Sequence, residues 1–297
     1  MSSKEKARVL LVGGGGVGAM ACYALESGRR AEVTVVLRSN FEAVQRNGFQ
    51  IDSIEHGNGI TGFRTTHIVN RVPNVVQEGL QPYNYIIVST KNIPDVRPNV
   101  LDVIEPAITS EATIVLLQNG LNIEKPIIER YPSNVVLSGV SIISASEPSH
   151  GVIKHEFTDS AKIGVFPAVK GDREMSETRA RRLVDIYNAC GKVNWEYDDD
   201  VAFTRWRKLM YNASYNSVSA ILGMGVVRMR MTQHIIDELI RPAMLEIRAA
   251  AKAAGIDLPD GLEDFLICLD PTDEDFLPSM GQDAAKVSPL SRVPGYP

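Results

Sequence analysis

The sequence has few cysteines and no long apolar run. Three of its 297 residues are cysteine, and Cys22, Cys190 and Cys268 lie far apart along the chain. They form no CxxC pair and no spacing typical of metal ligands, so we expect a reducing compartment and no bound metal. No run of about 18 apolar residues occurs, which predicts no membrane span. The opening segment, MSSKEKARVL, lacks the apolar core of a signal peptide, and we therefore expect a cytoplasmic protein.

The sequence also lacks an excess of positive charge. It has 31 Lys and Arg against 36 Asp and Glu, a formal net charge of -5, which gives no electrostatic case for binding nucleic acid. The five histidines form no HExxH pattern. With 44% hydrophobic and 23% charged residues, the composition is that of a globular protein with one large or two medium domains.

A glycine-rich turn near the N-terminus is the strongest motif. The apolar run Val9–Val12 predicts a strand buried on both faces. Gly13, Gly15 and Gly18 follow it and fit G-x-G-x-x-G, and residues 17–26 have helix-forming composition. Strand, glycine turn and helix in this order are the context that separates a dinucleotide site from a chance match. The alternative is a glycine-rich turn without a ligand.

Each glycine of this motif has its own physical reason. Gly13 allows a tight turn, Gly15 lets the backbone approach a pyrophosphate, and Gly18 lets the helix pack closely on the strand. The N–H groups at the start of the helix, including those of Gly16 and Val17, are expected to face the phosphates.

The end of the second predicted strand favours NADP(H). Sites that prefer NAD end this strand with Asp or Glu, which binds the ribose 2′-hydroxyl group. Here Glu32–Leu37 is followed by Arg38 and Ser39. A guanidinium group suits a 2′-phosphate by its charge and its forked donors. The alternative is an ordinary surface arginine after a strand.

The first two thirds of the chain predict an α/β fold with a doubly wound parallel sheet. Apolar runs and helical stretches alternate, as expected for parallel strands that have helices on both faces. Lys91 and Asn119 follow the ends of two strands, and ligands bind at the carboxyl ends of such strands. We therefore expect both residues at the nucleotide site. The expected strands cover 85–89, 113–117, 135–143, 161–165 and 193–197, with short strands or a hairpin in 49–72 and helices at 40–47, 96–108 and 179–190.

The pattern becomes helical near Asp198, which predicts a Rossmann-type domain over 1–197 and a helical domain over 198–297. In the helix expected over 201–222, Lys208, Asn212 and Asn216 lie four residues apart and share one face. A partly desolvated lysine can donate a proton to a carbonyl oxygen. The alternative is a solvated helix face. The amphipathic stretch 235–254 predicts a core or a subunit interface, compatible with a homodimer.

Taken together and in order, these motifs resemble the ketopantoate reductase family (2-dehydropantoate 2-reductases). The resemblance implies reduction of 2-dehydropantoate to (R)-pantoate with NADPH, in pantothenate and coenzyme A biosynthesis. It also implies an N-terminal Rossmann domain and an all-helical domain similar to the C-terminal domain of 6-phosphogluconate dehydrogenase. The motifs are GGGGVG at 13–18, Arg38, STK at 89–91, QNG at 118–120, WRKLMYNASYN at 206–216 and PSMGQD at 278–283.

The resemblance also implies residue roles. Lys208 corresponds to the general acid that protonates the keto oxygen, and Asn212 and Asn216 correspond to substrate-binding residues on the same helix. Ser279 corresponds to a serine that binds the substrate carboxylate. Lys91 and Asn119 correspond to residues at the boundary between cofactor and substrate.

The sequence departs from the family pattern after Asp283. The family continues with a basic stretch and a helix whose glutamate binds the substrate hydroxyl. This sequence continues with AAKVSPLSRVPGYP, in which Pro289 and Pro294 exclude a regular helix and no glutamate matches. Two alternatives therefore stand beside ketopantoate reduction: a paralogue that reduces another 2-keto acid, and a catalytically impaired NADP(H)-binding protein.

Overall fold

The computed structural model describes residues 6–167 and 172–286. Its contacts divide the chain into two units, Met1–Val201 and Ala202–Pro297. The sequence predicted this division after residue 197.

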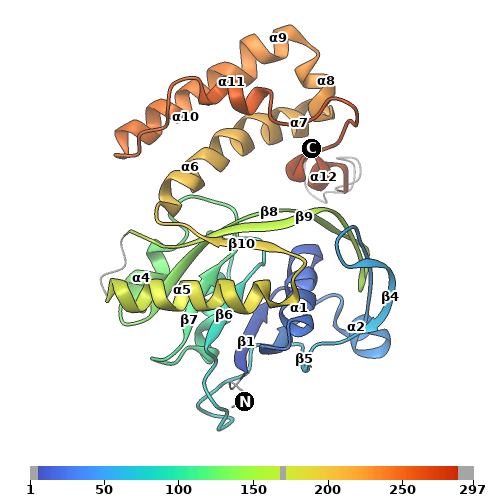
Figure 1. Ribbon diagram of the computed structural model, residues 1–297, viewed down its shortest axis with the longest axis vertical. Coiled ribbons are helices and arrows are strands. Elements are labelled where there is room, and N and C mark those ends of the chain that lie inside the picture. The colour runs from blue at the N-terminus through green and yellow to red at the C-terminus, as the bar shows by residue number, and fades with distance from the viewer. Residues whose placement is uncertain (1–5, 168–171, 287–297) are drawn as a thin grey trace. The chain divides into compact units, whose positions relative to one another are not determined.

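A ten-stranded sheet forms the centre of the first unit (Figure 1). The strand order is β4-β3-β9-β8-β7-β6-β1-β2-β5, with β10 paired to β9. Within this order, the six strands β8, β7, β6, β1, β2 and β5 run parallel to one another. The strands are β1 (Ala7–Val12), β2 (Ala31–Val36), β3 (Phe49–Ser53), β4 (Gly57–Phe63), β5 (His67–Val69), β6 (Tyr85–Val88), β7 (Thr113–Leu116), β8 (Val135–Ser149), β9 (Val152–Val165) and β10 (Asn194–Tyr197).

The sheet is covered by helices on both faces. Successive side chains of a strand point to opposite faces, so one strand contributes to the cores on both. In β1, Val9 and Leu11 pack in a core with α1 and α5, whereas Leu10 and Val12 pack in a second core with α3 and α4. The prediction of a doubly wound sheet is confirmed in this respect. The helices are α1 (Gly16–Ser27), α2 (Phe41–Asn47), α3 (Val100–Ile104), α4 (Lys125–Arg130) and α5 (Arg173–Tyr187), with 3-10 turns η1 (Glu105–Ala107) and η2 (Asn188–Cys190).

The sheet is mixed rather than wholly parallel. Strand β9 runs antiparallel to β8, and β3 pairs antiparallel with β4, which forms the hairpin expected within 49–72. The strand predicted over 161–165 is too short, because β9 already begins at Val152. Its first half alternates exposed residues such as Lys154 and Glu156 with buried ones such as His155, so it carries no apolar run.

The helix predicted over 96–108, which Pro98 and Pro106 were expected to bound or kink, is shorter than predicted. Only Val100–Ile104 is α-helical, followed by the 3-10 turn at Glu105–Ala107. Pro106 lacks an N–H group and cannot continue an α-helical ladder. Asn99 begins the helix, and its side chain accepts a hydrogen bond from the N–H of Asp102 in a reciprocal capping box.

The described part of the second unit consists of helices around a core that includes Met210, Tyr215, Ile240 and Met244. A stretch of π-helix, in which the backbone hydrogen bonds span five residues, lies between α6 and α7, and a second lies between α9 and α10. The elements are α6 (Val201–Tyr211), η3 (π, Asn212–Asn216), α7 (Ser217–Leu222), α8 (Val226–Arg230), α9 (Gln233–Ile235), η4 (π, Ile236–Ile240), α10 (Arg241–Ala253), α11 (Leu262–Ile267) and α12 (Ser279–Lys286).

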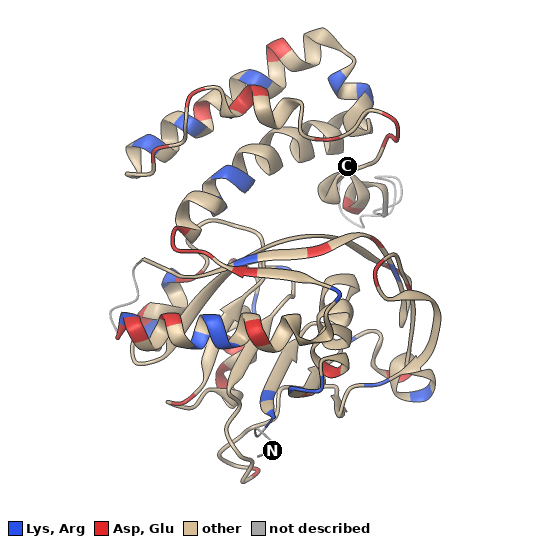
Figure 2. Cartoon of the chain, in the orientation of Figure 1, with Lys and Arg blue, Asp and Glu red and all other residues tan. Residues whose placement is uncertain are grey.

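Basic and acidic residues both occur along helices α5 and α10 (Figure 2). Within 6–167 and 172–286, the helices are too short or too polar to cross a lipid bilayer.

Candidate active site

The glycine turn between β1 and α1 has the geometry that the motif predicts. Gly13 has a φ of +107°, and a Cβ atom there would lie 2.8 Å from Cγ2 of Thr90. A Cβ atom on Gly18 would lie 1.8 Å from the carbonyl oxygen of Gly13, so helix and strand are in closest contact at this point. At Gly15, by contrast, a Cβ atom would meet no heavy atom within 4 Å. The turn is therefore closed on the protein side and open at Gly15.

The start of α1 supplies backbone donors beside this opening. Gly15 precedes the helix, and the first helical hydrogen bond joins the N–H of Ala19 to the carbonyl of Gly15 at 2.8 Å. The N–H groups of Gly16, Val17 and Gly18 precede that bond, which is the arrangement that favours an anion. These backbone donors and the open position at Gly15 fit a dinucleotide pyrophosphate.

Arg38 follows β2 and is exposed, with two further residues before α2 begins. An exposed guanidinium group at this position fits a 2′-phosphate on the adenosine ribose.

Hydrogen bonds join the loops that follow β1, β6 and β7. The hydroxyl group of Ser89 donates to the carbonyl of Gly13 at 2.7 Å. The side-chain amide of Gln118 donates to the carbonyl of Thr90 at 2.7 Å and lies 3.1 Å from its hydroxyl oxygen. Lys91 and Asn119 are the residues that follow Thr90 and Gln118, and both are exposed. The structure thus brings their loops to one edge of the sheet.

Ser89, Thr90 and Gln118 belong to the STK and QNG motifs, and no role was predicted for them from the sequence. Short polar residues at the carboxyl ends of parallel strands were the available signal, since neighbouring loops at this edge can hydrogen-bond to each other.

In the second unit, Lys208 lies on α6 and is partly buried. Burial, with a smaller contribution from the Arg205 guanidinium, lowers the pKa of Lys208 to about 8. Both causes disfavour the ammonium form, because a buried charge loses hydration and like charges repel. A lysine with this pKa is mostly protonated at pH 7 and releases its proton far more readily than an ordinary lysine.

Asn216 and Ser279, two predicted substrate residues, are in contact. The side-chain amide of Asn216 donates to the hydroxyl of Ser279, at the start of α12, over 3.2 Å. Asn216 is only 5% exposed, and its Oδ1 atom has no hydrogen-bond partner among residues 6–167 and 172–286. A buried acceptor without a partner is costly, and a ligand donor can satisfy it.

The regular helix predicted over 201–222 is wrong at residues 212–216. These form the π segment η3, so Asn212 and Asn216 are not related by the α-helical repeat. Within it, the hydroxyl of Ser214 donates to the carbonyl of Met210 at 2.8 Å. Ile221, near the end of α7, is 81% exposed. Such π segments are frequent at functional sites.

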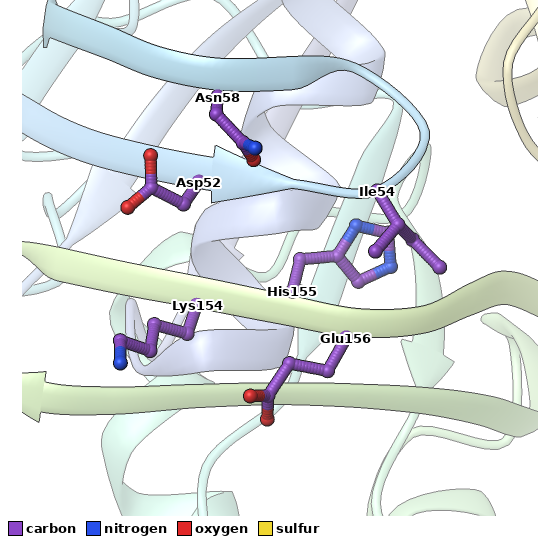
Figure 3. A pocket seen from close by; sticks show the side chains of 6 residues that line it. All are labelled: Asp52, Ile54, Asn58, Lys154, His155 and Glu156. Carbon is purple, nitrogen blue, oxygen red and sulfur yellow. The ribbon is translucent and has the colours of Figure 1, made fainter.

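A cavity of about 330 Å³ lies elsewhere in the first unit, along β3 and β9 (Figure 3). None of the predicted site residues lines it. Its buried His155 is held by Ser53, whose hydroxyl lies 2.8 Å from the ring Nδ1 atom. The lining residues are Asp52, Ile54, Asn58, Lys154, His155 and Glu156. We therefore place the candidate nucleotide site at the glycine turn rather than here.

In the part of the chain that the structure describes, no three or more His, Cys, Asp or Glu side chains gather as metal ligands.

Two family models match the chain. The model described as "Ketopantoate reductase PanE/ApbA" matches residues 9–168, and the model for the C-terminal region of the same family matches residues 200–291. The chain belongs to the ketopantoate reductase family. The predicted family is thereby confirmed.

Two relatives match most of the chain. The uncharacterized protein YDL144C of Saccharomyces cerevisiae is 32% identical over 271 residues, which cover 84% of this chain and 74% of that protein. A 2-dehydropantoate 2-reductase of Nostoc is 25% identical over 249 residues, which cover 82% of this chain and 73% of that protein.

Solved structures share the fold. A 2-dehydropantoate 2-reductase from Methylococcus capsulatus superposes with a TM-score of 0.79 at 24% identity, over 95% of this chain and 85% of that one. A D-mandelate dehydrogenase with NADH and anilino(oxo)acetate gives a TM-score of 0.76 at 20% identity, over 94% and 86%. The predicted fold class, a Rossmann-type domain followed by a helical domain, is confirmed.

Proposed function

We propose that this member of the ketopantoate reductase family reduces 2-dehydropantoate to (R)-pantoate with NADPH, as a step of pantothenate and coenzyme A biosynthesis in the cytoplasm. The observation that carries the proposal is Lys208, a partly buried lysine on α6 whose pKa is lowered to about 8. A group with this pKa can protonate a keto oxygen near neutral pH.

NADPH binding is assigned to the first unit. The N–H groups of Gly15, Gly16, Val17 and Gly18 hold the pyrophosphate, and Gly13 shapes the turn beneath them. Arg38 pairs with the 2′-phosphate, which NADH lacks, and so selects the phosphorylated cofactor. Lys91 and Asn119 lie at the boundary between cofactor and substrate. When bound, NADPH supplies the hydride.

Substrate binding and proton transfer are assigned to the second unit. As negative charge develops on the keto oxygen, the Lys208 ammonium stabilises it and donates its proton. Ser279 donates to the substrate carboxylate, and Asn212 and Asn216 orient the remaining polar groups. The unpartnered Oδ1 atom of Asn216 supports this role, because it can accept a hydrogen bond from a substrate hydroxyl group.

The division of labour follows the domains predicted from sequence, with the nucleotide domain over 1–197 and the substrate domain over 198–297. We propose that the chain also binds a second copy of itself, as a homodimer. We propose no nucleic acid, membrane or metal as a partner.

In the family pattern a glutamate follows the position of Asp283, and this sequence has no glutamate there. Residues 287–297 of that segment lie outside the described residues. Turnover measurements decide between ketopantoate reduction and the two alternatives, a paralogue and an impaired NADP(H)-binding protein.

The test is NADPH oxidation, followed by absorbance, with 2-dehydropantoate, a straight-chain 2-keto acid and an aromatic 2-keto acid as substrates, and with NADH in parallel. We expect turnover of 2-dehydropantoate with preference for NADPH, and its loss in Lys208→Ala. Turnover of another keto acid alone would establish the paralogue. NADPH binding without any turnover would establish the impaired protein.

A further inference from the structure

Asn40 stands immediately before helix α2 but does not cap it. Asparagine is a preferred residue at this position because its side-chain oxygen can accept a hydrogen bond from the first helical turn. Here the side chain makes no capping bond. Its amide nitrogen instead donates to the carbonyl oxygen of Gly14 at 2.9 Å and to Oε1 of Glu147 at 2.8 Å. Both partners are acceptors, so the orientation of the amide is fixed.

These bonds join three distant parts of the first unit. Gly14 lies in the glycine turn, Asn40 follows the loop of Arg38, and Glu147 lies near the end of β8. Oε1 of Glu147 also accepts from the N–H of Gly151 at 2.8 Å, in the turn between β8 and β9. Asn40 is only 5% exposed, so its bonds are shielded from water.

The glycine turn needs such a restraint. Four consecutive glycines, residues 13–16, have more backbone freedom than any other sequence of that length. The peptide unit that joins Gly14 to Gly15 is planar and trans, so its carbonyl and its N–H point in opposite directions. Because Asn40 holds the carbonyl of Gly14, the N–H of Gly15 is directed away from Asn40.

We propose that Asn40 is a positioning residue for the dinucleotide: it fixes the Gly14–Gly15 peptide so that the N–H of Gly15 is ready to donate to the pyrophosphate. The inference rests on the proposed nucleotide site. It separates two recognition tasks within one loop, in which Arg38 selects the 2′-phosphate and Asn40 organises the turn for the phosphates that NADPH and NADH share.

The experiment compares the dissociation constants of NADPH and NADH, measured by fluorescence titration of the full-length protein. In Asn40→Ala we expect both affinities to fall by a similar factor, about tenfold, which is typical of one lost hydrogen bond to a polar group. Arg38→Ala is expected to weaken NADPH alone. At saturating NADPH, kcat of Asn40→Ala should stay near that of the wild type while KM for NADPH rises.

Asn134 provides a matched control. It is also a buried asparagine of the first unit, 8% exposed, and its amide donates to the carbonyls of Thr109 and Ala112 at 2.7 and 2.9 Å. Asn134→Ala should lower the unfolding temperature as Asn40→Ala does, yet leave both dissociation constants unchanged. A purely structural role for Asn40 predicts the same behaviour for the two variants.

A second variant covers the case in which Asn40→Ala does not fold. In Asn40→Asp combined with Glu147→Gln, the new amide can donate to the new carboxylate, so the link to β8 is kept. The carbonyl of Gly14 still has no donor from residue 40, and both affinities should again fall. Wild-type affinity for both dinucleotides, in this double variant or in folded Asn40→Ala, would overturn the inference about Asn40 but not the proposed function. A wild-type protein that binds neither dinucleotide would overturn the proposed function as well.

Discussion

The pH dependence of turnover is the sharpest test of Lys208 as proton donor. The reduction needs the ammonium form, so the rate should follow the protonated fraction of Lys208. With its pKa lowered from 10.5 to about 8, Lys208 is protonated in roughly nine of ten molecules at pH 7 and in about one of ten at pH 9. An ordinary lysine would still be almost fully protonated at pH 9.

We therefore expect kcat/KM for keto-acid reduction, which reports the ionisation of the protein before the keto acid binds, to be level below pH 7 and to fall about tenfold per pH unit well above pH 8. Oxidation of the hydroxy acid by NADP, which needs the neutral amine, should show the opposite dependence and rise through the same range. The measurement is a set of initial rates between pH 6 and about pH 10, at saturating cofactor and at keto-acid or hydroxy-acid concentrations well below KM, with both directions followed by NADPH absorbance.

Two controls separate titration of Lys208 from other effects of pH. NADPH affinity measured across the same range detects loss of binding, and circular dichroism detects unfolding. In Lys208→Arg the guanidinium stays charged throughout, so any residual turnover should lose the fall near pH 8. A wild-type rate that stays level up to pH 10 would refute the assignment, as would an unchanged profile in Lys208→Arg.

Three further predictions follow from single contacts. Gly18→Ala should fail to fold or lose several kcal/mol of stability, because the new methyl group would lie 1.8 Å from the carbonyl of Gly13. Gly15→Ala, where the methyl group would meet no heavy atom within 4 Å, should unfold like the wild type and bind NADPH more weakly. Thermal unfolding and NADPH titration check both variants. Lys208→Met should raise the free energy of unfolding in urea by up to about 3 kcal/mol at pH 7, and unchanged stability would contradict the lowered pKa. Below pH 8, Lys208 of the wild type is protonated in both the folded and the unfolded state, and the folded state bears the full cost of the desolvated charge. Between pH 8 and pH 10.5 Lys208 loses its proton first in the folded state, so the stability advantage of Lys208→Met over the wild type disappears. Ser279→Ala should raise KM for the keto acid with little change in NADPH affinity, and an unchanged KM in steady-state kinetics would exclude Ser279 from the substrate site.

The parts of the fold that were predictable are those whose residues repeat a simple pattern. Val9–Val12 and the other apolar runs predicted the central parallel strands, since a strand buried on both faces must be apolar throughout. The first half of β9 was missed because one of its faces is exposed. Its length became evident only from its pairing with β8, which is a long-range contact.

The site was predictable to a different degree in each unit. In the first, local geometry decides the glycine turn, and the surroundings of Gly13, Gly15 and Gly18 are those that the motif predicts. In the second, the contact of Asn216 with Ser279 joins residues 63 positions apart, and only the resemblance to a family pointed to both.

Two features had no usable signal in the sequence. The π segment depends on how the whole helix packs, and no short motif specifies it. The bond from Asn40 to Gly14 spans 26 residues, and a sequence reading gives Asn40 the ordinary role of a helix cap.

The π segment at Asn212–Asn216 has a consequence for how this helix tolerates insertions and deletions. Each residue of an α-helix turns the chain by about 100°. A π turn accommodates one additional residue because each of its residues turns the chain by a smaller angle, so α6 and α7 keep nearly the phase of a regular helix that is one residue shorter. Deletion of Ala213 would therefore restore a regular helix and leave Asn216 near its present orientation relative to Lys208, whereas deletion of a residue within α6 would rotate everything after it by about 100°. We therefore expect relatives that differ in length by one residue in this helix to differ at the π segment.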